Sequence, residues 1–171
     1  MSLNLIEIVR RMNMASVVRG LIEYNGIDNC IRSRMKNFKQ VNFESTFCVP
    51  CQKPDIEQII KVSADTKILK YEIVKTPVGL SLEGQKVTGY KLLVSGDINY
   101  KIQYVADETT QSVHTFHESI PFCGYIVLPK KFNKDSYINP SALVEDISVE
   151  QMDERCVYGN INLLLIADIS C

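Results

Sequence analysis

The chain has 171 residues, which suffice for one domain with a substantial core and are too few for two ordinary domains. Its 19 basic and 20 acidic residues give a net charge of -1 without a long run of like charges, so we expect no nucleic-acid partner. The longest apolar run, residues 163–167, is far shorter than the roughly 20 residues that span a bilayer, and we expect no membrane span. The N-terminus has no signal-peptide pattern, which leads us to expect synthesis in a cytoplasm.

Residues 2–14 permit two interpretations. As a helix they begin with an Asn4-x-x-Glu7 capping pattern and gather apolar side chains on one face. These side chains are Leu5, Ile8, Val9 and Met12. A strand fits nearly as well, so both interpretations stay open.

The next part of the chain consists mainly of expected strands and connectors. Its elements, in order, are a strand at 16–24, a turn at Asn25-Gly26, a connector at 28–37, a strand at 41–49, a helical turn at 54–60, β structure at 61–74, and a loop at 76–89 with at most a short strand. The helical turn rests on Ile56, Ile59 and Ile60, which share a helical face after Pro54.

Residues 90–104 predict the strand around which the fold is organised. Apolar side chains fall on the even numbers from Tyr90 to Tyr104, and mostly polar residues fall between them. This period of two places tyrosine and aliphatic side chains on one face of a pleated strand. Gly96 interrupts the apolar row, which indicates a bulge or the close approach of another backbone.

The remaining residues predict further antiparallel strands. They comprise a turn at 106–111, a strand at 113–120 that pairs with the central strand and is broken by Pro121, a short strand at 124–129, a loop at 130–140, and a hairpin formed by 144–151 and 157–167. The fold class is therefore all-β, an antiparallel β-sandwich of seven or more strands with an N-terminal extension, part of which could be helical. The alternation predicts a core of Leu92, Val94, Ile98, Ile102, Phe116, Ile147, Val149, Leu163 and Leu165.

Several short motifs occur together between Phe43 and Ala167. They are Cys48-Val49-Pro50-Cys51-Gln52-Lys53-Pro54-Asp55-Ile56-Glu57-Gln58-Ile59, Thr76-Pro77-Val78-Gly79, Ser81-Leu82-Glu83-Gly84-Gln85, Tyr104-Val105-Ala106-Asp107, Gln111-Ser112-Val113-His114, Ile120-Pro121-Phe122 and Val144-Glu145-Asp146-Ile147. With these motifs the chain resembles the SPOCS domain family of spore-coat and sporulation proteins from spore-forming, largely anaerobic bacteria. The resemblance implies no reaction, and it implies binding to other coat morphogenetic proteins. It leads us to divide the chain into an assembly arm, residues 1–37, and a SPOCS-like β domain, residues 38–171.

The Cys48-Val49-Pro50-Cys51 motif has the spacing of a redox dithiol. A thioredoxin-like site needs its first cysteine at a helix N-terminus, whereas this motif ends an alternating strand, so structural or cross-linking thiols are favoured. A zinc site would add His114 and His117 as ligands. Three residues apart on a strand, these two imidazoles point to opposite faces, which argues against zinc.

Hydrolytic and phosphate-binding motifs are missing from the sequence. It contains neither a G-x-S-x-G elbow nor a phosphate loop. Its paired acidic residues fall in expected turns or strand ends, where charged side chains are ordinarily solvated. These residues are Asp107, Glu108, Glu145, Asp146, Asp153 and Glu154. We therefore expect a protein that is not an enzyme and holds no cofactor or metal.

Taken with the resemblance, these features lead us to expect a self-assembling structural protein of the spore's outer layers, either a coat protein or the subunit of a surface appendage. It would be made in the mother-cell cytoplasm and deposited on the spore surface, where its partners would be other copies and other coat proteins. The apolar face at Leu5, Ile8, Val9 and Met12 would pack on the next subunit. Disulfides between subunits are expected first at Cys30 and Cys171 and next at Cys48 and Cys51. The alternative is a monomeric adaptor that binds another coat protein through an exposed strand edge.

Overall fold

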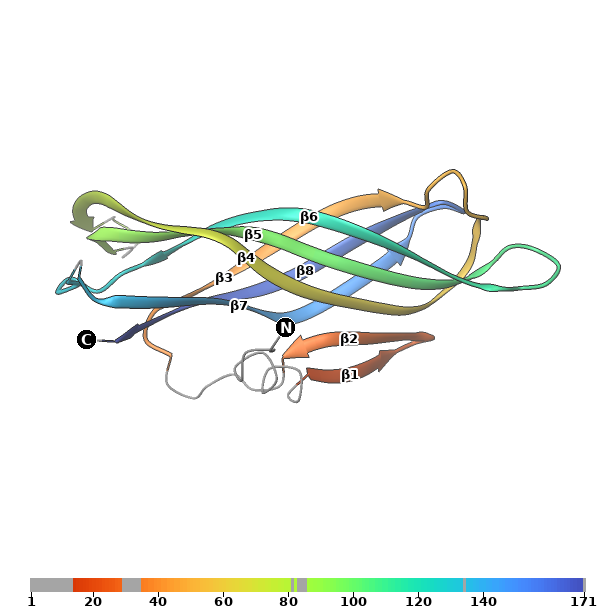
Figure 1. Ribbon diagram of the computed structural model, residues 1–171, viewed down its shortest axis with the longest axis horizontal. Helices are drawn as coiled ribbons and strands as arrows, with labels where there is room; N and C mark the ends of the chain where they lie inside the picture. Colours follow the sequence, from red (N-terminus) through yellow and green to blue (C-terminus); the bar gives the residue numbers. More distant parts are fainter. Residues whose placement is uncertain (1–13, 29–34, 81, 83–85, 134, 171) are drawn as a thin grey trace, which may run out of the picture.

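The computed structural model of the protein describes residues 14–28, 35–80, 82, 86–133 and 135–170. Within them eight strands form two sheets packed face to face, which gives an elongated sandwich (Figure 1). The strands are β1 (Met14–Arg19), β2 (Ile22–Asp28), β3 (Phe38–Cys48), β4 (Ile56–Leu80), β5 (Lys86–Ala106), β6 (Val113–Val127), β7 (Tyr137–Gln151) and β8 (Cys156–Ser170). The described residues contain no helix long and apolar enough to cross a membrane.

The two sheets differ in size and are both mainly antiparallel. The larger sheet has the order β1-β2-β4-β5-β6, and the smaller has the order β3-β8-β7. Among the described strands, β2 and β4 form the one parallel pair, and only three residue pairs connect them. The expected all-β, antiparallel sandwich is confirmed.

The core lies between the two sheets and consists of side chains at every second position of the long strands. All nine core residues expected from the alternation are buried, from Leu92 on β5 to Leu165 on β8. Gly96 on β5 is a point of close approach, as expected, because a Cβ atom there would lie 2.1 Å from the carbonyl oxygen of Lys67. The period of two therefore gave the correct inner face for the central strand.

β4 corrects the helical turn expected at residues 54–60. The pairing of β4 with β5 shifts between Ile56 and Gln58 and again between Ile59 and Lys61. Each bulge adds one residue to β4, so Ile56, Ile59 and Val62 all reach the buried face at intervals of three residues. Two bulges thus produced a spacing that is typical of a helix.

Two expected strand ends are also wrong. β4 continues to Leu80 and pairs there with Lys86, where the sequence suggested a loop at 76–89. β6 runs through Pro121, which opposes Asp97 on β5. Because β6 is an edge strand in the described part of the chain, a proline can join it without removing a hydrogen bond of the ladder.

The strand expected at residues 16–24 is in fact a hairpin. The chain turns at Gly20, where φ is +60°, and continues as β2. Asn25-Gly26, expected to be a turn, lies inside β2. Gly26 has φ of +98°, and a Cβ atom there would lie 1.9 Å from the carbonyl oxygen of Ala64. Glycine is therefore needed at this position for β2 to reach β4.

The hairpin of β1 and β2 belongs to the same sandwich as the rest of the described chain. Tyr24 and Ile27 are buried in the common core, and β2 extends the larger sheet. Residues 14–28, which belong to the expected arm at 1–37, therefore pack on the domain expected at 38–171, and the role of the arm in assembly stays a prediction. Residues 1–13, with Leu5, Ile8, Val9 and Met12, lie outside the described residues.

Candidate functional site

One cysteine, Cys48, has a different bonding partner from the one expected. Cys48 on β3 directly opposes Cys156 on β8, and the two form a disulfide within the chain. This bond corrects the expectation that Cys48 links subunits, and it leaves Cys48 unable to form a redox pair or a zinc site with Cys51. Cys51 and Cys123 are free and exposed. Cys30 and Cys171 lie outside the described residues.

The end of the sandwich next to this disulfide is held by Arg155, which the sequence analysis did not single out. Its guanidinium forms an ion pair with Asp55 and donates hydrogen bonds to the carbonyl oxygens of Val49, at 3.1 Å, and Pro50, at 3.0 Å. Arg155 thereby joins the β7–β8 turn to the β3–β4 connection. The sequence offered no signal for this role, since the partners are about 100 residues away.

Ser112, His114 and Glu108 form a cluster that superficially resembles a catalytic triad. The hydroxyl oxygen of Ser112 lies 2.9 Å from Nε2 of His114 and also donates to Glu108. Oε1 of Glu108 lies 3.7 Å from the same nitrogen. In a hydrolase triad the acid instead holds the other imidazole nitrogen. The hydrogen bond from Ser112 is the main cause of a lowered pKa at Glu108, and the cluster is suited to holding the β5–β6 turn.

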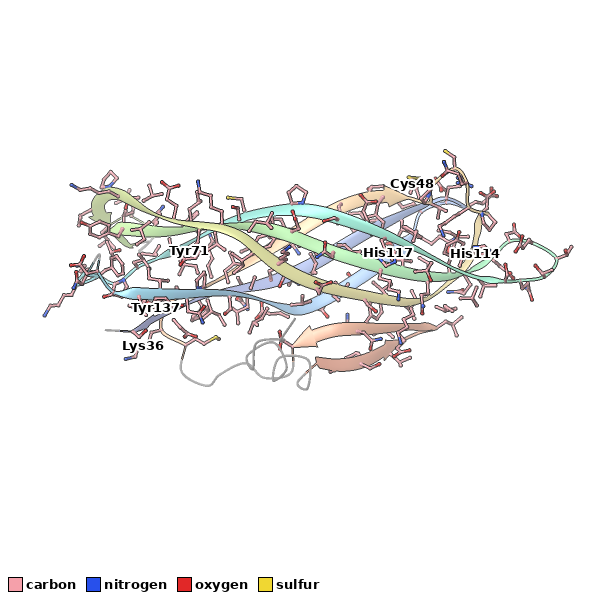
Figure 2. The ribbon with its side chains drawn as sticks, in the orientation of Figure 1. Lys36, Cys48, Tyr71, His114, His117 and Tyr137 are labelled. Atoms are coloured by element: carbon pink, nitrogen blue, oxygen red, sulfur yellow. A yellow bond between two sulfur atoms is a disulfide. The ribbon has the colours of Figure 1, made fainter. Side chains whose placement is uncertain are left out.

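The two histidines considered as zinc ligands have different surroundings. The ring of His114 stacks on Tyr104 with centroids 5.9 Å apart, while His117 is exposed on the outer face of the larger sheet (Figure 2). No group of three or more His, Cys, Asp and Glu residues suited to a metal occurs within the described ranges.

The β1–β2 hairpin occupies a place where the edges of the two sheets meet. We call this place the seat, and it consists of residues 61–64 of β4 and 146–149 of β7. Arg19 donates to Asp146 at 2.5 Å and to the carbonyl oxygen of Ile147 at 3.1 Å. The backbone N–H of Val149 donates to the hydroxyl oxygen of Tyr24 at 3.4 Å. The hairpin therefore bridges both sheets.

On the β4 side of the seat, Lys61 and Glu23 form an ion pair at 3.1 Å. Hydrogen bonds from Ser16, then from Lys61 and Asn25, lower the pKa of the Glu23 carboxyl group. These contacts fix the register of β2 against β4. These contacts could not be expected from the sequence, because Asn25-Gly26 has the composition of a turn.

Beyond Ser63, no strand of the described chain pairs with β4 on the side of β2. We call residues 67–75 of β4 the open edge. Leu69 and Tyr71 on it are 59% and 47% exposed, and Val74 is also exposed. Lys70 lies between Leu69 and Tyr71, and Lys67 and Lys75 lie at the two ends of the open edge. Figure 2 shows Tyr71 and Tyr137 at the end of the sandwich that lies opposite to Cys48 and His114.

The edge strands β6, β7 and β3 are better protected than the open edge. β6 contains Pro121, and β7 contains Pro140 and is covered by the hairpin at 146–149. The exposed side chains of β3 are mostly polar, at Gln40, Asn42, Glu44 and Thr46. Prolines and polar side chains oppose pairing with another chain. Compared with these three strands, the open edge combines an unpaired strand segment with several exposed apolar side chains.

Comparison with known proteins agrees with the resemblance found in the sequence. The family model described as SipL, SPOCS domain, matches residues 55–152, which is more than half of the chain. The match includes β4, β5, β6 and β7 and leaves out the β1–β2 hairpin. Neither the search of curated proteins nor that of solved structures finds a match. Because this match extends over more than half of the chain, the chain belongs to the SipL SPOCS-domain family, and its role is related to sporulation.

Proposed function

We propose that the protein is a non-enzymatic, self-associating structural component of the outer layers of a bacterial spore. The open edge of β4 carries this proposal. An unpaired strand presents a row of backbone donors and acceptors to another chain, and exposed apolar side chains add area that association can bury. Leu69, Tyr71 and Val74 supply such side chains on the open edge, and Val78 and Leu80 continue them toward the end of β4.

The lysines of the open edge limit what can bind there. Lys67, Lys70 and Lys75 disfavour indiscriminate pairing, because a cationic edge repels a second cationic edge. A productive contact must therefore match apolar side chains and offer acidic groups. Such a contact can lie between copies in a coat layer or appendage on the spore surface.

Light scattering after size-exclusion chromatography, followed by electron microscopy, tests this proposal. The protein should form large species, whereas the double variant Leu69→Lys, Val74→Lys should form fewer or none. The matched control is Val113→Lys, Met152→Lys, because Val113 and Met152 are each 61% exposed and lie away from the open edge. The control should assemble as the parent does. Equal assembly by all three proteins would refute a role for the open edge.

The second candidate is a monomeric adaptor that binds another spore-coat protein, and the same open edge favours it, since a strand of a different protein can add to it. The two functions give different results for the purified protein. An adaptor remains monomeric at all concentrations, and a structural subunit grows into large species.

A further inference from the structure

The family model includes the seat but not the hairpin that occupies it. The seat lies wholly within residues 55–152, which match the SPOCS model, whereas β1 and β2 precede them. Its β2–β4 contact is a parallel pairing on an otherwise antiparallel sheet, limited to three residue pairs. The hairpin therefore has the character of an added element that docks on a site of the domain.

The contacts in the seat are specific to this hairpin. Tyr24 fills the core beneath β7 and is 3% exposed, and Gly26 permits an approach to Ala64 that any other residue would prevent. Opposite charges meet on both sides of the seat, Arg19 with Asp146 and Glu23 with Lys61. A partner for the seat must reproduce these groups, and a second copy of this chain has them all.

The connection between the hairpin and the domain permits exchange between copies. Nine residues, 29–37, join the end of β2 to the start of β3. A chain of that length can reach about 30 Å. β2 and β3 belong to layers about 10 Å apart, and crossing the three-stranded sheet adds about 10 Å. The connection is therefore long enough to place the hairpin in its own seat, or in the seat of a second copy that lies within about 30 Å of the start of β3.

We propose that in the assembled protein the seat receives the β1–β2 hairpin of a second copy, in the contacts described above. This proposal rests on the proposed self-association and adds a second contact between copies to that of the open edge. Exchange of an identical element preserves every contact, so little free energy is lost by it. Each copy then gives one hairpin and receives one, and such a head-to-tail contact generates an open filament unless the rotation closes a ring.

The Lys61–Glu23 ion pair allows a direct test, because a carbodiimide converts it into an amide bond. Copies labelled with ¹⁴N and ¹⁵N are mixed while denatured, refolded together, assembled and cross-linked. If hairpins are exchanged, about half of the Lys61–Glu23 peptides should combine the two isotopes. The control is the Lys70–Glu72 pair, 3.4 Å apart within β4, whose cross-link stays within one chain and must not mix isotopes.

Assemblies whose Lys61–Glu23 peptides never mix isotopes overturn the exchange and leave the proposed self-association intact. A protein that stays monomeric overturns both. Gly26→Ala gives an independent readout, because the added methyl group should keep the hairpin from the seat and lower the assembled fraction at least tenfold. Gly79→Ala is its control, since a Cβ atom at Gly79 has no neighbour within 4 Å. Undiminished assembly of Gly26→Ala also overturns the exchange.

Discussion

Cys48 and Cys156 oppose each other directly across β3 and β8, and their disulfide joins positions 108 residues apart in the sequence. A bond that closes so long a loop restricts the unfolded chain and thereby stabilises the folded one. We expect the Cys48→Ser, Cys156→Ser variant to lose about 2–5 kcal/mol of unfolding free energy. Chemical denaturation of both proteins measures this difference.

The control for this experiment is Cys51→Ser, Cys123→Ser, which replaces the two exposed free cysteines of the described chain. It should unfold at the same denaturant concentration as the parent. A Cys48→Ser, Cys156→Ser variant as stable as this control would show that the disulfide does not form in solution.

The core provides a second prediction. Ile102 and Leu163 are fully buried on the facing strands β5 and β8. Replacement of either by alanine removes apolar contacts and leaves a cavity, so each variant should lose about 2–5 kcal/mol of unfolding free energy. Leu21→Ala is the control, because Leu21 is 77% exposed in the β1–β2 turn and its truncation should change stability little. Parent-like melting of both core variants would contradict the packing.

The sequence predicted the inner faces of long strands because a single alternation extends through each of them. Residues 90–104 keep one parity from end to end, and so do residues 157–165 of β8. Where β4 carries bulges, the parity changes and the pattern imitates a helix at Ile56 and Ile59. Bulges depend on pairing with another strand, so local sequence could not reveal them.

The candidate sites depended even more on contacts between distant residues. Cys48, like Cys51, was expected to form disulfides between subunits, yet the fold places it against Cys156 of the same chain. Asn25-Gly26 has the composition of a turn, but Gly26 is needed where β2 approaches Ala64. In both cases the residue type was informative, and only the pairing of strands could show its role.

The seat should be sensitive to acid through Glu23. Hydrogen bonds from Ser16, Lys61 and Asn25 lower the pKa of this carboxyl group below its ordinary value of 4.5. A lowered pKa in the folded state stabilises the protein above the ordinary pKa, and this contribution is lost as the pH falls through the folded value. The hairpin should therefore bind the seat less strongly as the pH falls below 4.5.

Melting temperatures of the parent and of Glu23→Gln between pH 7 and pH 3 test this effect. The parent should lose more stability over this range than Glu23→Gln, because glutamine does not titrate. Glu72→Gln, which changes an exposed carboxylate outside the seat, is the control and should follow the parent. Identical pH profiles for parent and Glu23→Gln would argue against a stabilising role for this carboxylate.

The last prediction concerns the remaining cysteines. After oxidation, disulfides between subunits should form at Cys30, Cys171 and Cys51, because Cys48 is already bonded to Cys156 and Cys51 is exposed. On non-reducing gels, oxidised assemblies should give a ladder of covalent multimers that reducing agent removes. The Cys30→Ser, Cys51→Ser, Cys171→Ser variant should run as a monomer even though it still assembles. Cys123→Ser is the matched single change and should keep the ladder, and a ladder that survives in the triple variant would assign the cross-link to Cys123 instead.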